Sequence, residues 1–224
     1  MRKVAYMEYK KTEENLYTYR HMSTEDILRE AVVKYGIQKK QGEFTIEDLE
    51  KFPDDMRMEL IDGVIYDMAA PNHKHQIIAG KVFWIFEDFV MKKKGKCIVE
   101  MAPMNVQLDR DDKTMVQPDI LITCDRDKLL KNSVYGDPDL VVEILSPSTR
   151  KKDVTIKLRK YKNSRVREFW IIDPEKKLVQ VYEFEKSDFP TTYTFEDKIP
   201  VGIFGGECEV DFEMINEYVA FLYE

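Results

Sequence analysis

The stretch DLVVEILS, residues 139–146, reads as a buried β-strand that carries a carboxylate in its middle. A continuous apolar run of this length, rich in β-branched residues, is typical of a strand covered on both faces. Glu143 lies within the run, and burying an unpaired carboxylate is costly or raises its pKa strongly. The strand therefore predicts either a buried basic partner for Glu143, such as Arg167 or Lys157, or a functional site.

The segments on both sides of this strand predict the rest of an α/β fold. Asp62-Gly63 lies between two short apolar runs and is a typical hairpin turn. The apolar periodicity predicts two principal helices, at residues 75–91 and 153–163, and extended segments at residues 97–108, 114–124, 168–174 and 177–184. We expect a mixed β-sheet flanked by helices.

Length and composition are typical of a folded, soluble protein. Of the 224 residues, 43% are hydrophobic and 34% are charged, which favours a globular domain over a disordered chain. We expect an N-terminal extension with one helix, starting at Ser23, in residues 1–42 and one domain in residues 43–224. The net charge of −7 argues against a protein that coats nucleic acid non-specifically, but it is compatible with a local basic face.

The cysteines and the hydropathy pattern predict a cytoplasmic protein. Cys97, Cys124 and Cys208 are widely spaced and form no CxxC pair, so we do not expect a structural zinc site. A reducing compartment fits these cysteines best. The chain has no apolar run of roughly 18 residues, so we expect no membrane segment.

Asp119 and Glu143 are the candidate metal ligands. Asp119 follows Pro118 at the start of the apolar stretch ILIT, and Glu143 lies in the next apolar strand of the core. Carboxylates on neighbouring strands repel each other and commonly hold a divalent cation, for which oxygen ligands favour Mg²⁺ or Mn²⁺ over zinc. Such a cation polarises a phosphate oxygen and activates a water. The alternative for Asp119 is the cap of a turn.

Lys157, on the basic helix downstream, is the candidate for orienting the attacking water and stabilising the developing charge. Asp153, Lys157 and Tyr161 recur at four-residue spacing, which places them on one side of that helix. We therefore also consider Asp153 a candidate for a supporting role. Glu59 opens the upstream hairpin and is a candidate accessory acid. For Lys157 the alternative is a solvated position on the helix surface.

Residues 150–167 form a dense basic segment with nine Lys or Arg and one acid. The segment predicts contacts to a nucleic-acid backbone, and an ordinary solvated helix face is the alternative. The candidate contact residues are Arg150, Lys151, Lys152 and Lys160. His75 begins the long helix and is a further candidate for a supporting role at the site, although a helix-start hydrogen bond would also explain it.

Six segments occur in the order typical of one large bacterial family. They are MELIDGVIYDM, HKHQIIAGKV, VQPDILI, GDPDLVVEILSPSTRKKD, KLRKYKNSRVREFWIIDP and LVQVY. Over residues 43–205 the chain resembles the Uma-type family of putative restriction endonucleases, a divergent branch of the PD-(D/E)xK nuclease superfamily. The pairing of VVEILSPST with FWIIDP is quite specific for this family.

The resemblance implies a restriction-endonuclease-like core and Mg²⁺-dependent (or Mn²⁺-dependent) cleavage of phosphodiesters, with DNA as the expected substrate. It also implies that Asp119 and Glu143 are the metal carboxylates, that Glu59 is an accessory acid, and that the protein forms a homodimer. The chain departs from the superfamily pattern at Leu145, where a lysine is expected. In this family Lys157 matches as the substitute. The alternative is a catalytically inactive module that keeps the fold and binds nucleic acid or protein partners.

Overall fold

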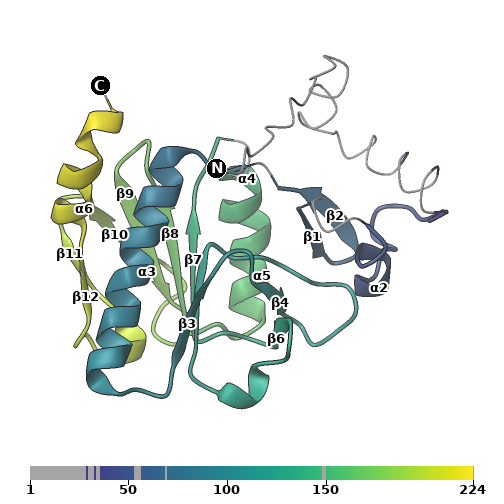
Figure 1. Ribbon diagram of the computed structural model, residues 1–224, viewed down its shortest axis with the longest axis horizontal. Helices are drawn as coiled ribbons and strands as arrows, with labels where there is room; N and C mark the ends of the chain where they lie inside the picture. The colour runs from purple at the N-terminus through teal and green to yellow at the C-terminus, as the bar shows by residue number, and fades with distance from the viewer. Residues whose placement is uncertain are drawn as a thin grey trace, which may run out of the picture.

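The computed structural model describes residues 29, 33, 36–52, 57–68, 70–147 and 150–223. Its centre is a six-stranded sheet with the strand order β10-β9-β8-β7-β5-β3 (Figure 1). The strands β7 and β8 run parallel, and every other neighbouring pair in this sheet is antiparallel. The predicted mixed sheet is therefore confirmed. The bounds are β3 Ile98–Met101, β5 Ile120–Thr123, β7 Leu140–Ile144, β8 Glu168–Asp173, β9 Leu178–Glu183 and β10 Thr191–Thr194.

One face of the sheet packs against the long helix α3, His73–Lys93, and the C-terminal helix α6, Phe212–Val219, which η5, Ala220–Leu222, follows. Asn72 caps the start of α3 by accepting a hydrogen bond from the backbone N–H of His75 at 2.9 Å. The helix ends at Lys94, which has a left-handed backbone with φ 50°, one residue before the predicted stop at Gly95.

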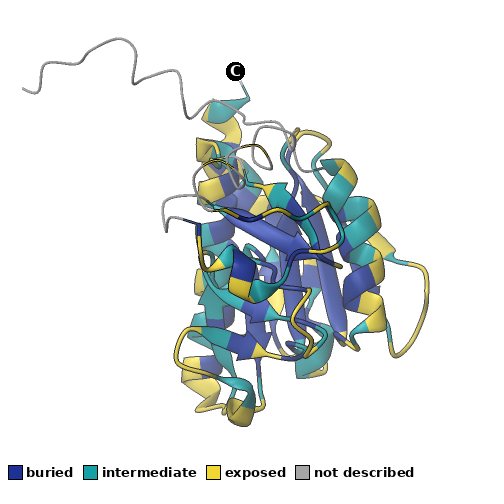
Figure 2. Ribbon diagram, turned by 90° about the vertical axis from the view of Figure 1, so that its right-hand side faces the viewer, coloured by how far each residue is buried: buried dark blue, intermediate teal, exposed yellow. Residues whose placement is uncertain are grey.

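The opposite face of the sheet packs against a continuous helical segment. It consists of α4, Arg150–Lys152; η3, Asp153–Lys157, which is a π-helix; and α5, Leu158–Asn163. Because side chains alternate along a strand, Val141, Leu145 and Phe169 pack on this face, whereas Val142 and Trp170 pack beneath α3. Figure 2 shows the buried strands between helices on both sides.

A small subdomain flanks the helical segment. It contains α2, Ile46–Leu49, and the predicted hairpin of β1, Met58–Ile61, and β2, Val64–Asp67. At the tip of the hairpin Asp62 and Gly63 both have positive φ, of 52° and 74°, as a tight hairpin turn requires. The expected helix from Ser23 lies almost entirely outside the described residues.

Short elements complete the fold. The strand β4, Asn105–Gln107, pairs in parallel with β6, Ser133–Tyr135, and β11, Lys198–Pro200, pairs with β12, Glu209–Asp211. Two 3₁₀ turns, η2 at Arg126–Lys128 and η4 at Gly202–Phe204, lie in the connections. None of the residue ranges predicted for extended segments or helices includes β6, the edge strand β10, the strands β11 and β12, or the helix α6.

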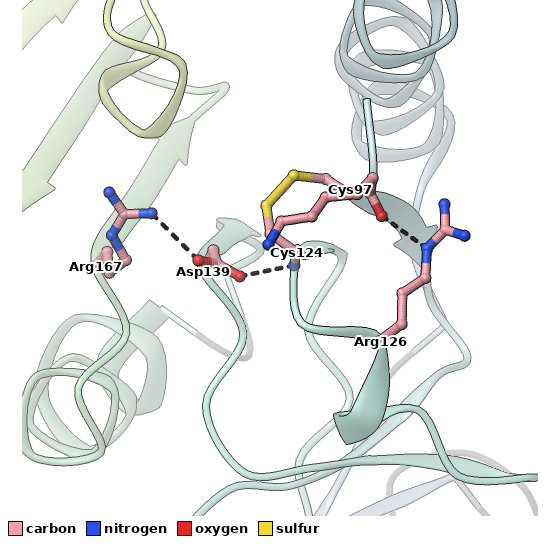
Figure 3. The surroundings of a disulfide bond; sticks show 6 residues. Cys97, Cys124, Arg126, Asp139 and Arg167 are labelled. Carbon is pink, nitrogen blue, oxygen red and sulfur yellow. Dashed lines mark hydrogen bonds and ion pairs between the residues drawn. A yellow bond between two sulfur atoms is a disulfide. The ribbon is translucent and has the colours of Figure 1, made fainter. Parts of the chain in front are cut away.

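Cys97 and Cys124 form a disulfide at the ends of the neighbouring strands β3 and β5 (Figure 3). The backbone N–H of Cys124 also donates to Asp139, which forms an ion pair with Arg167. The sequence did not predict this bond, because the pairing depends on β3 and β5 being neighbours in the sheet. Cys208 is a free, buried thiol. The cytoplasmic location stays a prediction. Among the described residues, no helix has both the length and the hydropathy of a transmembrane span.

Candidate active site

A cavity of about 360 Å³ lies where β5 begins and β7 ends. Asp119, Glu143 and Lys157 line it, together with both predicted supporting residues, His75 and Asp153. The fold therefore brings together five residues from four segments of the sequence. Each comes from a different part of the structure: the start of β5, the middle of β7, the first turn of α3 and the two ends of the π-helix.

Glu143 is only 3% exposed, and its buried charge has two partners on one oxygen. Its Oε1 atom accepts from Lys157 Nζ at 2.8 Å and from the hydroxyl of Tyr161 at 2.6 Å. Of the two basic partners that the sequence suggested, Lys157 is the one in contact. Arg167 instead pairs with Asp139 and Glu185 at the surface.

Lys157 contacts Glu143 from the π-helix that packs on the sheet, whereas the superfamily pattern expects the lysine at position 145, directly after β7. Leu145 at that position is buried in the apolar cluster beneath the helices. Lys157 lies at the end of the π-helix, a rare geometry that is found frequently at functional sites. Its ammonium is also 2.7 Å from Glu59 Oε1 and 3.7 Å from Asp153 Oδ1.

Glu59 lies behind the cavity and does not line it. Its side chain is fully buried, and both of its oxygens have partners. Oε1 accepts from the backbone N–H of Gln117 and contacts Lys157, while Oε2 is 2.5 Å from Lys152 Nζ. In this arrangement Glu59 holds two lysines, which differs from the accessory metal ligand that the family resemblance implies.

Asp119 is held by its Oδ2 atom. That oxygen is 3.1 Å from His75 Nε2 and accepts from the backbone N–H of Ile144 at 2.7 Å. The contact places His75 beside Asp119, as expected for a supporting residue. The first turn of α3 fixes the histidine, because the Asn72 cap binds its backbone.

The electrostatics of the site follow from an excess of carboxylates over lysines. Burial raises the pKa of Glu143 well above its ordinary value; Lys157 opposes this shift, whereas the charges of Asp153, Asp119 and Glu59 add to it. Burial alone would lower the pKa of Lys157, but the charges of Glu143 and Glu59 outweigh burial and raise it strongly. Burial likewise opposes the ionisation of Glu59, yet Lys157 and Lys152 lower its pKa to about 2. At the site the carboxyl groups of Asp119, Glu143, Asp153 and Glu59 thus lie around Lys152, Lys157 and Arg57, and a further cation would favour the ionised form of Glu143.

The donor set fits a magnesium ion. Among the described residues, Asp119 Oδ1 and Glu143 Oε2 have no hydrogen-bond partner, although the second oxygen of each carboxylate is firmly held. No group of three His, Cys, Asp or Glu side chains that could hold a metal occurs in the described part of the chain. Mg²⁺ commonly binds proteins through one or two carboxylates and keeps several waters, so two carboxylates suffice.

The predicted nucleic-acid contacts are mostly engaged within the protein. Arg150 forms two hydrogen bonds with Asp173, at 2.6 and 2.8 Å. Lys152 binds Glu59, and Lys160 is nearly buried between Asp62 and Asp109. Only Lys151 of the four is exposed and without such a partner among the described residues. Sequence could not show this neutralisation, because the acids come from distant segments.

Two residues at the site were not predicted as functional. Tyr161 was noticed only for its four-residue spacing from Lys157, and that spacing is the signal that could have found it. Gln117 lines the cavity, and its side-chain nitrogen donates to Asn105 at 2.9 Å. Nothing in the local sequence distinguishes Gln117 from any other residue that precedes a Pro-Asp pair.

Comparison with known proteins agrees with this geometry. Residues 45–202 match the model of the Uma2 family, described as "Putative restriction endonuclease". The chain belongs to this family. An uncharacterised protein of Synechocystis sp. is 30% identical over 103 residues, which are 46% of this chain and 53% of that protein. The chain thus spans about half the length of this relative.

A solved structure shares the fold. It is described as a putative nuclease belonging to DUF820 from Anabaena variabilis, and it superimposes with a TM-score of 0.63 at 21% sequence identity. The match covers 76% of this chain and 96% of the other. The predicted family and the predicted α/β fold are both confirmed.

Proposed function

We propose that this protein is a metal-dependent phosphodiesterase of the PD-(D/E)xK type that cleaves DNA. The observation that carries the proposal is the 2.8 Å contact between Lys157 Nζ and Glu143 Oε1 in the cavity that Asp119 also lines. Two carboxylates beside a lysine are the side chains that metal-assisted phosphodiester hydrolysis uses. Membership in a family described as restriction endonucleases supports the same substrate class.

In this proposal Asp119 and Glu143 hold Mg²⁺ or Mn²⁺ through their free oxygens. The bound cation supplies charge neutralisation at the phosphate and lowers the pKa of a water. His75 and the backbone N–H of Ile144 fix Asp119, so that its other oxygen faces the cavity in a defined direction. Tyr161 does the same for Glu143.

Lys157 provides a fixed positive charge next to the reacting phosphate. Because Glu143 and Glu59 raise its pKa, the ammonium stays protonated and serves as a hydrogen-bond donor rather than a general base. It can donate to the attacking water or to a phosphate oxygen, where charge develops in the transition state. Glu59 and Asp153 position the ammonium from behind.

Cleavage of supercoiled plasmid tests the proposal. With Mg²⁺ or Mn²⁺ we expect nicking by the wild type and a loss of about 10²–10⁴-fold in Asp119→Ala and Glu143→Gln, the range for removing a group that stabilises the transition state. Glu168→Gln is the matched control, because Glu168 is a buried carboxylate on the neighbouring strand that does not line the cavity. Equal nicking by all four proteins would show a contaminating nuclease and overturn the assignment.

A second candidate is a module that keeps the nuclease fold without turnover. The observation in its favour is that Lys157 already contacts three carboxylates, so its ammonium is strongly committed within the protein. Calorimetric titration with Mn²⁺ separates the two candidates. The nuclease should give heat that disappears in Asp119→Ala, whereas the inactive module should give the same trace for both proteins.

We further propose that the active form is a homodimer, because two such sites in one assembly can cut both strands of a duplex in a single encounter. Sedimentation with and without a short duplex measures the assembly. A protein that stays monomeric on DNA while still cutting both strands would contradict this part of the proposal.

A further inference from the structure

A second cavity, of about 520 Å³, lies at the other end of the basic helix from the active site. Three cations and two acids line it: Arg110, Lys128, Arg165, Asp109 and Asp137. The lining residues Leu108, Asp109 and Arg110 directly follow β4, and Asp137 follows β6. Figure 1 shows both strands near α5.

Both acids of this cavity are already neutralised. Asp137 forms an ion pair with Lys128 at 3.1 Å, and Asp109 accepts from Lys160 and from the hydroxyl of Ser164. The guanidinium groups of Arg110 and Arg165, in contrast, have no carboxylate or hydrogen-bond partner among the described residues. The cavity therefore has a net positive charge carried by two free guanidiniums.

Both arginines have a left-handed backbone conformation, which is unfavourable for residues other than glycine. Arg110 has φ 56° and Arg165 has φ 67°, in the left-handed region that residues with a Cβ rarely adopt. Arg165 follows Ser164, the C-cap of α5, at the position where helices usually carry glycine. Non-glycine residues with a strained backbone cluster at binding sites, which suggests that the two arginine side chains have a binding role.

The side chain of Arg110 is also held in place. It lies against Gly136, where any Cβ would collide with the guanidinium, and its Cζ is 5.7 Å from the centre of the Tyr135 ring. An ordered guanidinium loses less freedom on binding an anion than a freely rotating one.

We propose that this second cavity binds a phosphate group of the nucleic-acid backbone through Arg110 and Arg165. The proposal rests on the proposed function. The planar guanidinium of an arginine can donate two parallel hydrogen bonds to two oxygens of one phosphate. A cavity lined by two arginines therefore suits a phosphate group. The eight residue steps from Lys157 to Arg165 span roughly 12 Å at the rise of an α-helix, about three to four nucleotides along a strand. The second cavity thus supplies the phosphate contacts that Arg150, Lys152 and Lys160 cannot make.

Glycine substitutions give a test that separates binding from folding. Arg110→Gly and Arg165→Gly remove the charges but suit the positive φ, so we expect a melting temperature equal to or above that of the parent. DNA binding is measured without metal in an Asp119→Ala background, over a range of salt concentrations. We expect the double variant to bind about tenfold more weakly, with a slope of log K against log salt that is smaller by roughly 0.9 for each phosphate that the protein no longer neutralises.

The matched control is Lys186→Gln/Lys198→Gln, which removes the same net charge from exposed positions nearer the far edge of the sheet. Arg165→Lys keeps a cation at the site and should retain most of the slope. If the glycine variants do not fold, the same measurement is made with Arg110→Gln/Arg165→Gln. A slope that matches the parent, or that falls only as far as in the control, overturns the proposal.

Two further results distinguish the possible sources of phosphate. Binding of inorganic phosphate is measured by the NMR chemical-shift changes that it causes. If the variants lose these changes but keep the parental salt dependence of DNA binding, the ligand is a free anion and the nucleic-acid assignment is wrong. If the slope falls as expected while the wild type cleaves no plasmid, the second cavity is supported and the proposed nuclease activity is what fails.

Discussion

Glu143 and Glu168 are two buried glutamates on the neighbouring parallel strands β7 and β8, and they differ in their hydrogen-bond partners. They are 3% and 1% exposed. Glu143 points to the face that packs against the basic helix, where its partners are a lysine and a tyrosine beside the cavity. Glu168 accepts from Trp170 Nε1 at 2.6 Å and from the backbone N–H of Ile203 at 2.7 Å.

The difference lies in the partners and not in the burial. Burial raises the pKa of both carboxyl groups. The neutral donors around Glu168 tie η4 to the sheet, and Glu168 lines neither the active-site cavity nor the second cavity. Glu143 has a cationic partner and a free oxygen at a cavity. A buried carboxylate therefore indicates a reactive site only when the surrounding charges and access to solvent agree.

Removing the lysine that contacts Glu143 should give the largest loss in the free energy of unfolding. Lys157→Met leaves Glu143 and Glu59 buried with one lysine fewer, and breaking a buried ion pair costs about 3–5 kcal/mol. Urea unfolding at neutral pH measures the loss. The control Lys162→Met breaks an exposed pair with Asp188 and should cost less than about 1 kcal/mol. Adding Glu143→Gln to Lys157→Met should recover part of the stability; a strictly additive double variant would contradict a direct charge interaction.

Removing the acceptor at Glu168 should cost less. Glu168→Leu leaves the indole N–H of Trp170 and the N–H of Ile203 buried without their acceptor, a loss of about 1–3 kcal/mol. Plasmid cleavage should remain at the wild-type level when the folded fraction is taken into account. A large loss of cleavage in a folded Glu168→Leu protein would mean that the two glutamates are not functionally distinct.

The smallest effect is the part of the pH dependence of stability that comes from Glu168. Burial raises its pKa above the ordinary 4.5, despite the hydrogen bonds from Trp170 and Ile203. The folded protein then holds this proton more tightly than the unfolded chain, so the stabilisation is complete below the unfolded pKa and is lost as the pH rises through the folded pKa. Glu168→Gln cannot titrate. Its unfolding free energy should therefore rise relative to the wild type as the pH increases from the unfolded pKa, about 4.3, through the raised folded pKa, and a constant difference over that range would refute the assignment.

Local patterns predicted a large part of the fold because they depend on residues close in sequence. The predicted strand at 139–146 corresponds to β7, and the predicted helix at 75–91 corresponds to α3. The predicted turn at Asp62-Gly63 joins β1 and β2. The strand β6 was missed, because Ser133–Tyr135 is only three residues long and its partner strand β4, Asn105–Gln107, lies far earlier in the sequence. The disulfide was missed for the same reason, since nothing local pairs Cys97 with Cys124.

The residues of the site were predictable as a set, but their arrangement was not. An acid in an apolar strand, a Pro-Asp pair and a helix with four-residue spacing identified Glu143, Asp119 and Lys157, and the cavity brings all three together. The surface charge was not predictable. Arg150 and Lys160 look free in the sequence, but Asp173 and Asp109 neutralise them in the fold.

The sequence by itself therefore determined the strand that carries Glu143, the mixed sheet around it and the family to which the chain belongs, because these depend on side-chain periodicity and on the order of motifs. Only the tertiary structure decided which charges meet. The π-helix places the Lys157 ammonium 2.8 Å from Glu143 Oε1, whereas Leu145 is buried in the apolar cluster on the same face of the sheet. Glu59 holds lysines, whereas Arg110 and Arg165 at the second cavity have no acidic partner among the described residues, because electrostatic partners are set by distance in space and not by distance along the chain.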